Sequence, residues 1–363
     1  MGFGLYTYSI MRIINRYLSR QLIAIFVMLL LILTGLAWTM QIMAMMKFLL
    51  NYGINFGSFI GLVAFLIPFI ISIIIPFVTF IAVIFVYNKT IADNEVSVMM
   101  ASGLSPWQLA RPAIRFATIL TVLNLILNIW LVPISQSYFY DTQWNLRYGL
   151  AHLKVQESAF TNITDGLVVY VDKVSGHDMS QVMLSDTRNE KNNMVVFAET
   201  GKLVTTPRGL SIVMENGSLQ SHGRAMVTGT FDTFDMDLGL AEQENSGAFR
   251  VRRISSGNLL KYVRNPVGDA KQQKAVLSEL SNRFLMPFMN LILAIVCATI
   301  LLKTSLLRRR ASFSPAMAVL SMAILMTLYM TSANMLVSLN DFYILAFGVF
   351  LVLGVSIMVL RKK

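Results

Sequence analysis

The residues that could perform chemistry are few in this 363-residue chain, and they are poorly placed for it. The three histidines, His152, His177 and His222, are scattered through one polar segment without metal-ligand spacing. The chain has no H-E-x-x-H helix motif and no G-x-x-x-x-G-K-[ST] loop to cradle the phosphates of ATP. We therefore predict no catalytic residue, no metal site and no cofactor, and any energy from ATP hydrolysis must come from another subunit.

The stretch DNEVSVMMASGLSPWQ, residues 93–108, carries an isolated pair of acids, Asp93 and Glu95, between two apolar segments. Asp93 or Asn94 is suited to cap a helix, and Glu95 then lies in the first turn, where the helix dipole favours a carboxylate. Gly103 is suited to the left-handed position that ends the helix. The letters SPWQ that follow have the spacing of a capping box, which predicts a second helix after a sharp corner.

One stripe of the first of these helices is apolar and rich in methionine. Four residues share it at helical spacing: Val96, Met99, Met100 and Gly103. A helix that rests on lipid favours Lys and Arg on its polar face, but none occurs between Thr90 and Ala110. Because anionic lipid would repel the two acids, we expect a protein partner for this helix rather than a membrane surface.

Long uncharged segments surround these residues and determine the fold class. The chain is 55% apolar and 13% charged, about half the charged fraction of a soluble domain. A bilayer span needs roughly 20 apolar residues, and six segments provide that length: 22–46, 60–87, 116–138, 284–302, 314–333 and 342–360. Their interiors contain no Asp, Glu, His, Lys or Arg, so an intramembrane enzyme, the rival class, would lack an acid or base.

The distribution of Lys and Arg predicts the topology. Thirteen of the 30 cations lie at one set of span ends, whereas the opposite short loops contain Lys47 alone. By the positive-inside rule, both termini and the 93–108 stretch are predicted to be cytoplasmic. Residues 140–283 hold sixteen cations and sixteen acids, so the net charge of +11 reflects membrane topology and not a surface for nucleic acid.

Between the third and fourth spans the sequence changes to short β-type runs separated by turn signals such as Asn216-Gly217. The predicted strands are Leu167–Val174, Gln181–Asp186, Met194–Ala198, Lys202–Thr205, Leu210–Met214, Ser218–Ser221 and Ala225–Leu238. This spacing favours a sandwich, jelly roll or barrel. Such a domain can lend a sheet edge to a neighbour, with Leu167–Val174 and Ala225–Leu238 as candidate edges. Cys297, the single cysteine, lies in a predicted span, so no disulfide within the chain can stabilise this domain.

The sequence thus predicts a membrane α-helical fold of six transmembrane helices (three plus three) with an inserted periplasmic all-β, jelly-roll-like domain. Residues 1–139 form the first membrane half with its cytoplasmic helix, and residues 140–260 form the β domain. Residues 261–363 form a connecting helix and the last three spans.

Several segments resemble a known family. The letters YNK at 87–89, DNEV at 93–96, VMMASGLS at 98–105 and LARP at 109–112 resemble the signature of the LptF/LptG permeases, the two membrane subunits of the lipopolysaccharide-export ABC transporter. The stretch RIINRYL at 12–18, Pro68 and Pro76 in the second span, and the order of spans and β domain match as well. The letters QESAF at 156–160 and the strands after them are closer to the F-type than to the G-type subunit.

The resemblance implies half of an exporter. LptF and LptG would form one cavity that opens sideways to the outer leaflet of the inner membrane, bind lipopolysaccharide there, and pass it to a periplasmic bridge that includes LptC and LptA. A dimer of the cytoplasmic ATPase LptB would drive them. The family's coupling helix corresponds to residues 93–103, which implies these contacts to the ATPase: Asp93, Glu95, Val96, Met99, Met100 and Gly103.

Two cations are candidate contacts to the phosphates of such a substrate. Lys47 is the one cation in the short outer loops, and Arg283 directly precedes the fourth span. The alternative is that both side chains snorkel to the interface and anchor their helices. For the function as a whole, the alternative is a permease of another ABC-type envelope system, for lipoprotein release or mechanotransmission. Those subunits usually have four spans, whereas six are predicted here.

Overall fold

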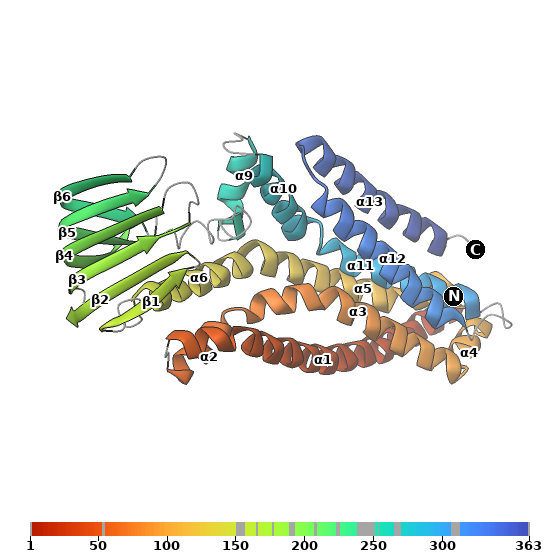
Figure 1. Ribbon diagram of the computed structural model, residues 1–363. Helices are drawn as coiled ribbons and strands as arrows, with labels where there is room; N and C mark the ends of the chain where they lie inside the picture. The colour runs from red at the N-terminus through yellow and green to blue at the C-terminus, as the bar shows by residue number, and fades with distance from the viewer. Residues whose placement is uncertain are drawn as a thin grey trace. The chain divides into compact units, whose positions relative to one another are not determined.

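The computed structural model describes residues 2–52, 55–149, 157–164, 166–175, 178–188, 193–206, 209–222, 226–237, 251–252, 254–264, 270–305 and 313–361 (Figure 1). Packing divides the chain into two units. The first consists of Met1–Ala44, Val63–Tyr138 and Val251–Lys363, and the second of Met45–Leu62 and Phe139–Arg250. The three-part division at residues 139 and 260 stays a prediction.

The helices account for most of the chain. Their bounds are α1 (Gly2–Tyr52), α2 (Phe56–Ala64), α3 (Ile67–Ala92), α4 (Glu95–Ala101), α5 (Pro106–Ile126), the π-helix η1 (Leu127–Leu131), α6 (Val132–Gly149), α9 (Ser256–Arg264), α10 (Ala270–Phe284), α11 (Phe288–Ser305), α12 (Ser314–Asn334) and α13 (Leu339–Arg361). In the described part of the chain, five helical segments are long and apolar enough to cross a membrane. A sixth span results if the bent pair α10 and α11 counts as one. The predicted multi-pass helical fold is confirmed.

The core of the first unit is built around α11. This helix packs against α3, α5, α12 and α13, and Leu293, Cys297 and Leu301 along it are at most 1% exposed. A helix that is apolar on every side is buried on every side. By contrast, this chain buries only 11%, 22% and 17% of the apolar windows of α1, α12 and α13. Those helices therefore keep large apolar surfaces for lipid or for another membrane chain.

The fourth predicted span starts later than the sequence suggested. It was expected at residue 284, but α11 begins at Phe288, and α10 meets it at an angle of 54°. Pro287 explains the break, because proline lacks an N–H and its ring collides with the carbonyl four residues earlier. The N–H groups of Leu285 and Met286 both donate to the carbonyl of Ser281, at 2.8 and 3.1 Å, and so close the end of α10.

The second unit contains an antiparallel sheet that confirms the inserted all-β domain. Its strands are β1 (Ala159–Thr164), β2 (Leu167–Ser175), β3 (Asp178–Asp186), β4 (Asn193–Thr206), β5 (Gly209–His222) and β6 (Met226–Asp237), in the order β1-β2-β3-β4-β5-β6 (Figure 1). The described strands thus form a meander, in which each strand pairs with the next one in sequence. A jelly roll would also pair strands that are distant in sequence, and the described strands show no such pair.

Two pairs of predicted short strands are each one long strand. Met194–Ala198 and Lys202–Thr205 belong to β4, while Leu210–Met214 and Ser218–Ser221 belong to β5. The predicted Asn216-Gly217 turn therefore lies inside β5. Asn216 has a left-handed φ of 54°, and pairing with β6 resumes at Gly217 after one skipped position. The interruption is a local irregularity and not a hairpin, because both flanks keep pairing with β4 and β6.

The edges of the sheet also differ in part from expectation. Leu167–Val174 lies in β2, which pairs with β1 on one side and with β3 on the other. Among the described strands the edges are β1, which had no predicted counterpart, and β6, which corresponds to the predicted run Ala225–Leu238. Of the two candidate edges, only the second is an edge.

Gly217 provides a test of the packing around the irregularity in β5. A Cβ at this position would overlap the carbonyl oxygen of Phe197 and the ring of Phe231, whereas a Cβ at Gly229 in β6 would meet no atom within 4 Å. We expect Gly217→Ala to destabilise the sheet by about 1–3 kcal/mol, as overpacking does. Gly229→Ala is the matched control and should have little effect. Hydrogen exchange of β5 and β6 in the full chain measures both, and equal protection in the two variants would contradict the prediction.

Candidate functional site

The site predicted at residues 93–108 is a sharp corner between two candidate spans. The helix α3 ends at Ala92, and the N–H groups of Asp93 and Asn94 turn back to the carbonyls of Lys89 and Ile91 at 2.9 and 3.0 Å. Asn94 takes the capping position of α4 in the left-handed conformation, with φ of 60°, and its side chain makes no capping hydrogen bond. The predicted cap is therefore in place, but it acts through backbone geometry.

The helix α4 ends at the position predicted from Gly103. Gly103 has φ of 92°, its N–H donates to Met100 O at 3.0 Å, and the N–H of Leu104 donates to Met99 O at 3.3 Å. This pair of bonds is a Schellman motif, which satisfies carbonyls that the helix end would leave unpaired. Leu104 then enters the core against which Met99 also packs, and this contact fixes the direction in which the chain leaves α4.

The second helix of the corner starts with the predicted capping box. The N–H of Gln108 donates to Ser105 Oγ at 3.3 Å, and the N–H of Ser105 donates to Gln108 Oε1 at 2.8 Å. Two N–H groups of the first turn are thereby satisfied. Both ends of the corner are thus fixed by local hydrogen bonds that the sequence specifies.

The apolar stripe of α4 faces its own chain. Val96 is 2% exposed and belongs to the core, and Met99 and Met100 are half-buried against it. The outer face instead presents Val98, which is 68% exposed, together with Ala101 and Ser102. The roles of the stripe residues in coupling stay a prediction, and the geometry adds the outer residues as the surface that a partner can reach.

Glu95 lies at the start of α4 and is tied to α1. The hydroxyl of Tyr17 donates to Glu95 Oε1 at 3.2 Å, and both side chains are partly exposed. The carboxylate is therefore held in one direction while its remaining lone pairs stay available. Tyr17 lies 78 residues away in sequence, and nothing in the local pattern pointed to it.

Two further contacts brace the corner from other helices. The buried hydroxyl of Tyr87 in α3 donates to the carbonyl of Leu109 in α5 at 2.7 Å. The guanidinium of Arg361, at the end of α13, lies 4.7 Å from the centre of the Trp107 ring and makes a cation–π contact. The corner is therefore held by α1, α3 and α13, so that a push on α4 is passed to several helices.

The corner presents a small acidic surface. Asp93 and Glu95 supply negative charge, and no Lys or Arg lies between Thr90 and Ala110 to offset it. Among the described residues, no three His, Cys, Asp or Glu side chains are close enough to hold a metal ion. A basic groove on a partner protein would complement such a surface, and that contact stays a prediction.

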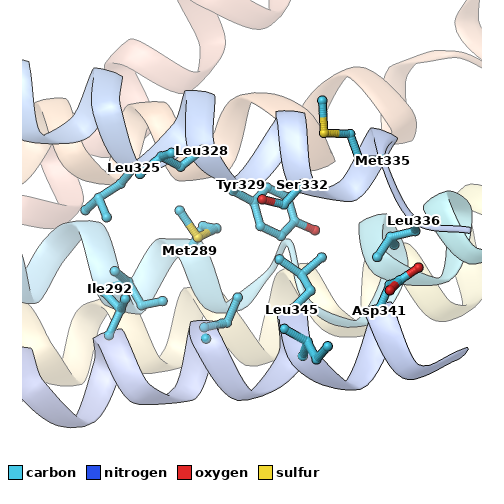
Figure 2. A pocket seen from close by; sticks show the side chains of 14 residues that line it. Met289, Ile292, Leu325, Leu328, Tyr329, Ser332, Met335, Leu336, Asp341 and Leu345 are labelled. Atoms are coloured by element: carbon cyan, nitrogen blue, oxygen red, sulfur yellow. The ribbon is translucent and has the colours of Figure 1, made fainter. Parts of the chain in front are cut away.

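A second feature of the first unit is an apolar pocket among α11, α12 and α13, with a volume of about 520 Å³ (Figure 2). Leu, Ile, Met and Val side chains form most of its wall. Its polar side chains include Tyr329, whose hydroxyl donates to Ser281 O at 2.9 Å, and Asp341, which accepts the N–H groups of Val337 and Ser338 at 3.1 and 2.9 Å. Because these two groups are already paired, the pocket favours an apolar occupant.

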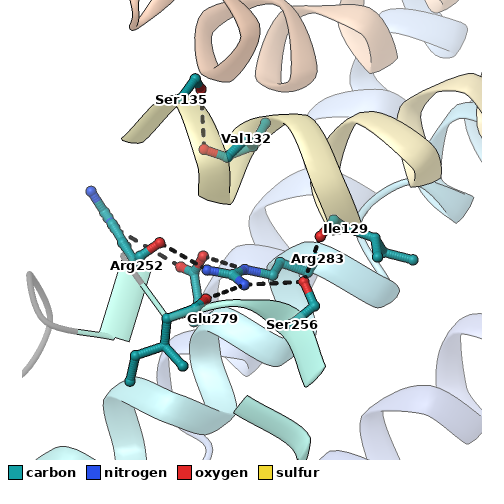
Figure 3. Close-up of polar contacts among 8 residues, drawn as sticks. Ile129, Val132, Ser135, Arg252, Ser256, Glu279 and Arg283 are labelled. Atoms are coloured by element: carbon teal, nitrogen blue, oxygen red, sulfur yellow. Dashed lines mark hydrogen bonds and ion pairs between the residues drawn. The ribbon is translucent and has the colours of Figure 1, made fainter. Parts of the chain in front are cut away.

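The two candidate substrate contacts lie in different settings. Lys47 is in α1, and its side chain lies outside the described residues. Arg283 is 1% exposed and donates hydrogen bonds to Glu279, to Ser256 and to two backbone carbonyls (Figure 3). In this conformation its guanidinium is committed to partners inside the chain. The contact of either residue with a phosphate stays a prediction.

Comparison with known proteins places the chain in a family. The model of the family "Lipopolysaccharide export system permease LptF/LptG" matches residues 16–362. The protein RP871 of Rickettsia prowazekii (strain Madrid E) is 20% identical over 301 residues, which cover 81% of this chain and 82% of that protein. The lipopolysaccharide export system permease protein LptF of Escherichia coli (strain K12) is 24% identical over 155 residues, 42% of either chain. Since the family model spans nearly the whole sequence, this chain belongs to the LptF/LptG family of lipopolysaccharide export system permeases.

Proposed function

We propose that this chain is one of two permease subunits of an ABC transporter that extracts lipopolysaccharide from the bacterial inner membrane and passes it to a periplasmic bridge. The observation that carries this proposal is α4, a short acidic helix between two spans, which Tyr17 of α1 contacts directly and whose neighbour α5 is held by α3 and α13. A helix that is fixed so firmly to the spans and exposes its outer face suits a handle for a separate ATPase, LptB.

The orientation in the membrane is part of the proposal. Both termini and α4 would be cytoplasmic and the β domain periplasmic, because the cations of the short loops gather on one side. The paired permease, LptG if this chain is the F type, would cover part of α1, α12 and α13, whose apolar surfaces this chain leaves largely open. Lys47 and Arg283 remain candidates for the phosphates of the substrate, and Arg283 must leave its present partners to reach them.

The β domain would continue the path of the lipid through a neighbouring periplasmic domain such as LptC or LptA. Of its two edges, β6 has 12 residues and β1 has six. A long edge strand presents unpaired backbone groups and is a ready template for strand addition. The lipid class bound to the purified complex would separate lipopolysaccharide export from lipoprotein release, the alternative.

Glu95 tests the coupling role of α4. A carboxylate paired in a partner's groove leaves an unpaired buried charge when it is removed, at a cost on the order of 3–5 kcal/mol. We expect Glu95→Ala to lose assembly with the ATPase, or to retain ATP hydrolysis without lipid export. Tyr17→Phe, which keeps the carboxylate and removes only its hydrogen bond, should give a smaller defect.

Glu215→Ala is the matched control, because it removes an exposed carboxylate from β5. ATPase activity and export by the coexpressed complex in inner-membrane vesicles measure all three variants. Normal lipid export by the Glu95→Ala variant would contradict the coupling role of Glu95.

Photocrosslinkers test the β6 edge. We expect crosslinkers at the exposed positions Val227 and Thr233 of β6 to capture a periplasmic protein of the bridge, because strand addition would place its backbone beside this edge. Thr200 of β4 is the matched control, since it is exposed but pairs with Ser180 of β3 on one side and with Glu215 of β5 on the other. Immunoblots of the irradiated cells report the adducts. Equal capture at all three sites, or none at β6, would contradict strand addition at this edge.

A further inference from the structure

The break between α10 and α11 is held by buried polar contacts that a membrane span does not normally contain. Pro287 prevents one continuous helix, but a proline alone leaves the direction of the break open. Among the described residues, Arg283 at the end of α10 contacts the segment that leads into α9, and Ser281 contacts α12. Sharp bends in helices need an identified cause, and these contacts supply one for the 54° angle.

The guanidinium of Arg283 makes four hydrogen bonds (Figure 3). Its Nε donates to Glu279 Oε1 at 2.8 Å, so the carboxylate one turn earlier neutralises the buried charge. Nη1 and Nη2 donate to the carbonyl oxygens of Ile254 and Arg252 at 2.8 and 2.9 Å. The end of α10 is thereby tied to the backbone of the segment that leads into α9. Only a planar fork of donors can serve these partners together.

Ser256 extends this contact to the π-helix η1. Its hydroxyl accepts a hydrogen bond from Nη1 of Arg283 at 3.2 Å and donates one to the carbonyl of Ile129 at 2.7 Å. A hydroxyl has a single proton. Because Ser256 donates that proton to Ile129, it can only accept from Arg283, so the hydrogen bonds run from Arg283 through Ser256 to Ile129. Ile129 is the middle residue of η1, and single π-turns inside α-helices occur frequently at functional sites.

Ser281 makes the corresponding contact to α12. Tyr329 Oη donates to Ser281 O at 2.9 Å and lies 3.0 Å from Ser281 Oγ. The ring of Tyr329 lines the apolar pocket among α11, α12 and α13 (Figure 2). One turn of α10 therefore holds η1 through Arg283 and a wall of the pocket through Ser281.

We propose that Arg283 and Ser256 form a latch that fixes α10 to η1, and that α10 and α12 move as one piece when the latch opens. Arg283 is then a positioning residue, since it acts through Ser256 and the backbone. Among the described hydrogen bonds, one serine hydroxyl connects Arg283 to η1, whereas Tyr329 contacts two atoms of Ser281. A role for the latch in a transport cycle rests on the proposed function, whereas the latch contacts themselves belong to this chain alone.

Two distances between spin labels report separately on the latch and on the contact of α10 with α12. Spin labels at Lys274 in α10 and Ile126 in α5, both exposed, report the position of α10 beside η1. Labels at Lys274 and the exposed Leu320 in α12 report the α10–α12 pair. Cys297 is buried and stays unlabelled. Pulsed electron spin resonance of the purified full chain in lipid nanodiscs gives both distance distributions.

Ser256→Ala removes the bridge to Ile129 without exposing a charge. We expect this variant, and Arg283→Lys, roughly to double the width of the Lys274–Ile126 distribution as a second position becomes populated. The Lys274–Leu320 distribution should keep its width. Ser256→Thr retains the hydroxyl and should restore the narrow Lys274–Ile126 distribution, a rescue that simple loosening of the fold would not give.

Lys261→Ala is the control variant, because it removes an exposed charge from α9 and leaves the hydrogen bonds of Arg283 and Ser256 in place. If Ser256→Ala leaves the Lys274–Ile126 distribution unchanged, or if both distributions broaden together, the latch is wrong. Should Arg283→Lys fail to fold, Ser256→Ala and its Thr rescue decide the question alone. If export proves independent of this chain, the proposed function fails while the two distances still test the latch.

Discussion

Much of this structure follows from one constraint, that polar groups inside a membrane need partners within the protein, with the buried amide of Asn290 among the exceptions. The hydroxyls of Thr79, Thr90 and Thr121 each donate to the carbonyl four residues earlier at 2.8 Å, so they add no unpaired donor to their spans. The same requirement determines where a span can be interrupted. At Pro287 the carbonyl of Ser281 accepts two N–H groups of its own chain and the hydroxyl of Tyr329. An interruption without such partners would cost several kcal/mol for each unpaired group.

The corner at α4 satisfies the same requirement by local means. Its Schellman motif and its capping box pair the groups at the two helix ends, and they involve only residues between Met99 and Gln108. Contacts from α1, α3 and α13 then fix the corner to the bundle. Local capping gives α4 its shape, and the distant contacts give it a firm attachment. Both are needed if a force on its exposed face is to move whole spans.

The features that the sequence predicted are those with local signals. Uncharged length gave the spans, Gly103 gave the end of α4, and the Ser105–Gln108 spacing gave the capping box. The features that it missed depend on residues far apart in sequence. Ser256 and Ile129 are separated by 127 positions and Tyr17 and Glu95 by 78, so no periodicity relates them. Local signals also failed where tertiary pairing prevailed: Asn216-Gly217 has the composition of a turn, but pairing of both flanks with β4 and β6 keeps it within a strand.

The two interruptions are held in different ways, and this difference suits different tasks. The α4 corner has contacts to three other helices, and a change in its angle would break a buried hydrogen bond, an exposed one and a cation–π contact together. The Pro287 break reaches η1 through the single hydroxyl of Ser256. Between them, α11 is buried on all sides and packs against α3, α5, α12 and α13. Close-packed interiors transmit strain and do not absorb it. Under the proposed function, a movement that an ATPase imposes at α4 would therefore pass through α3 to α11 and along it to the break, where α10 can change its direction once the Ser256 contact opens.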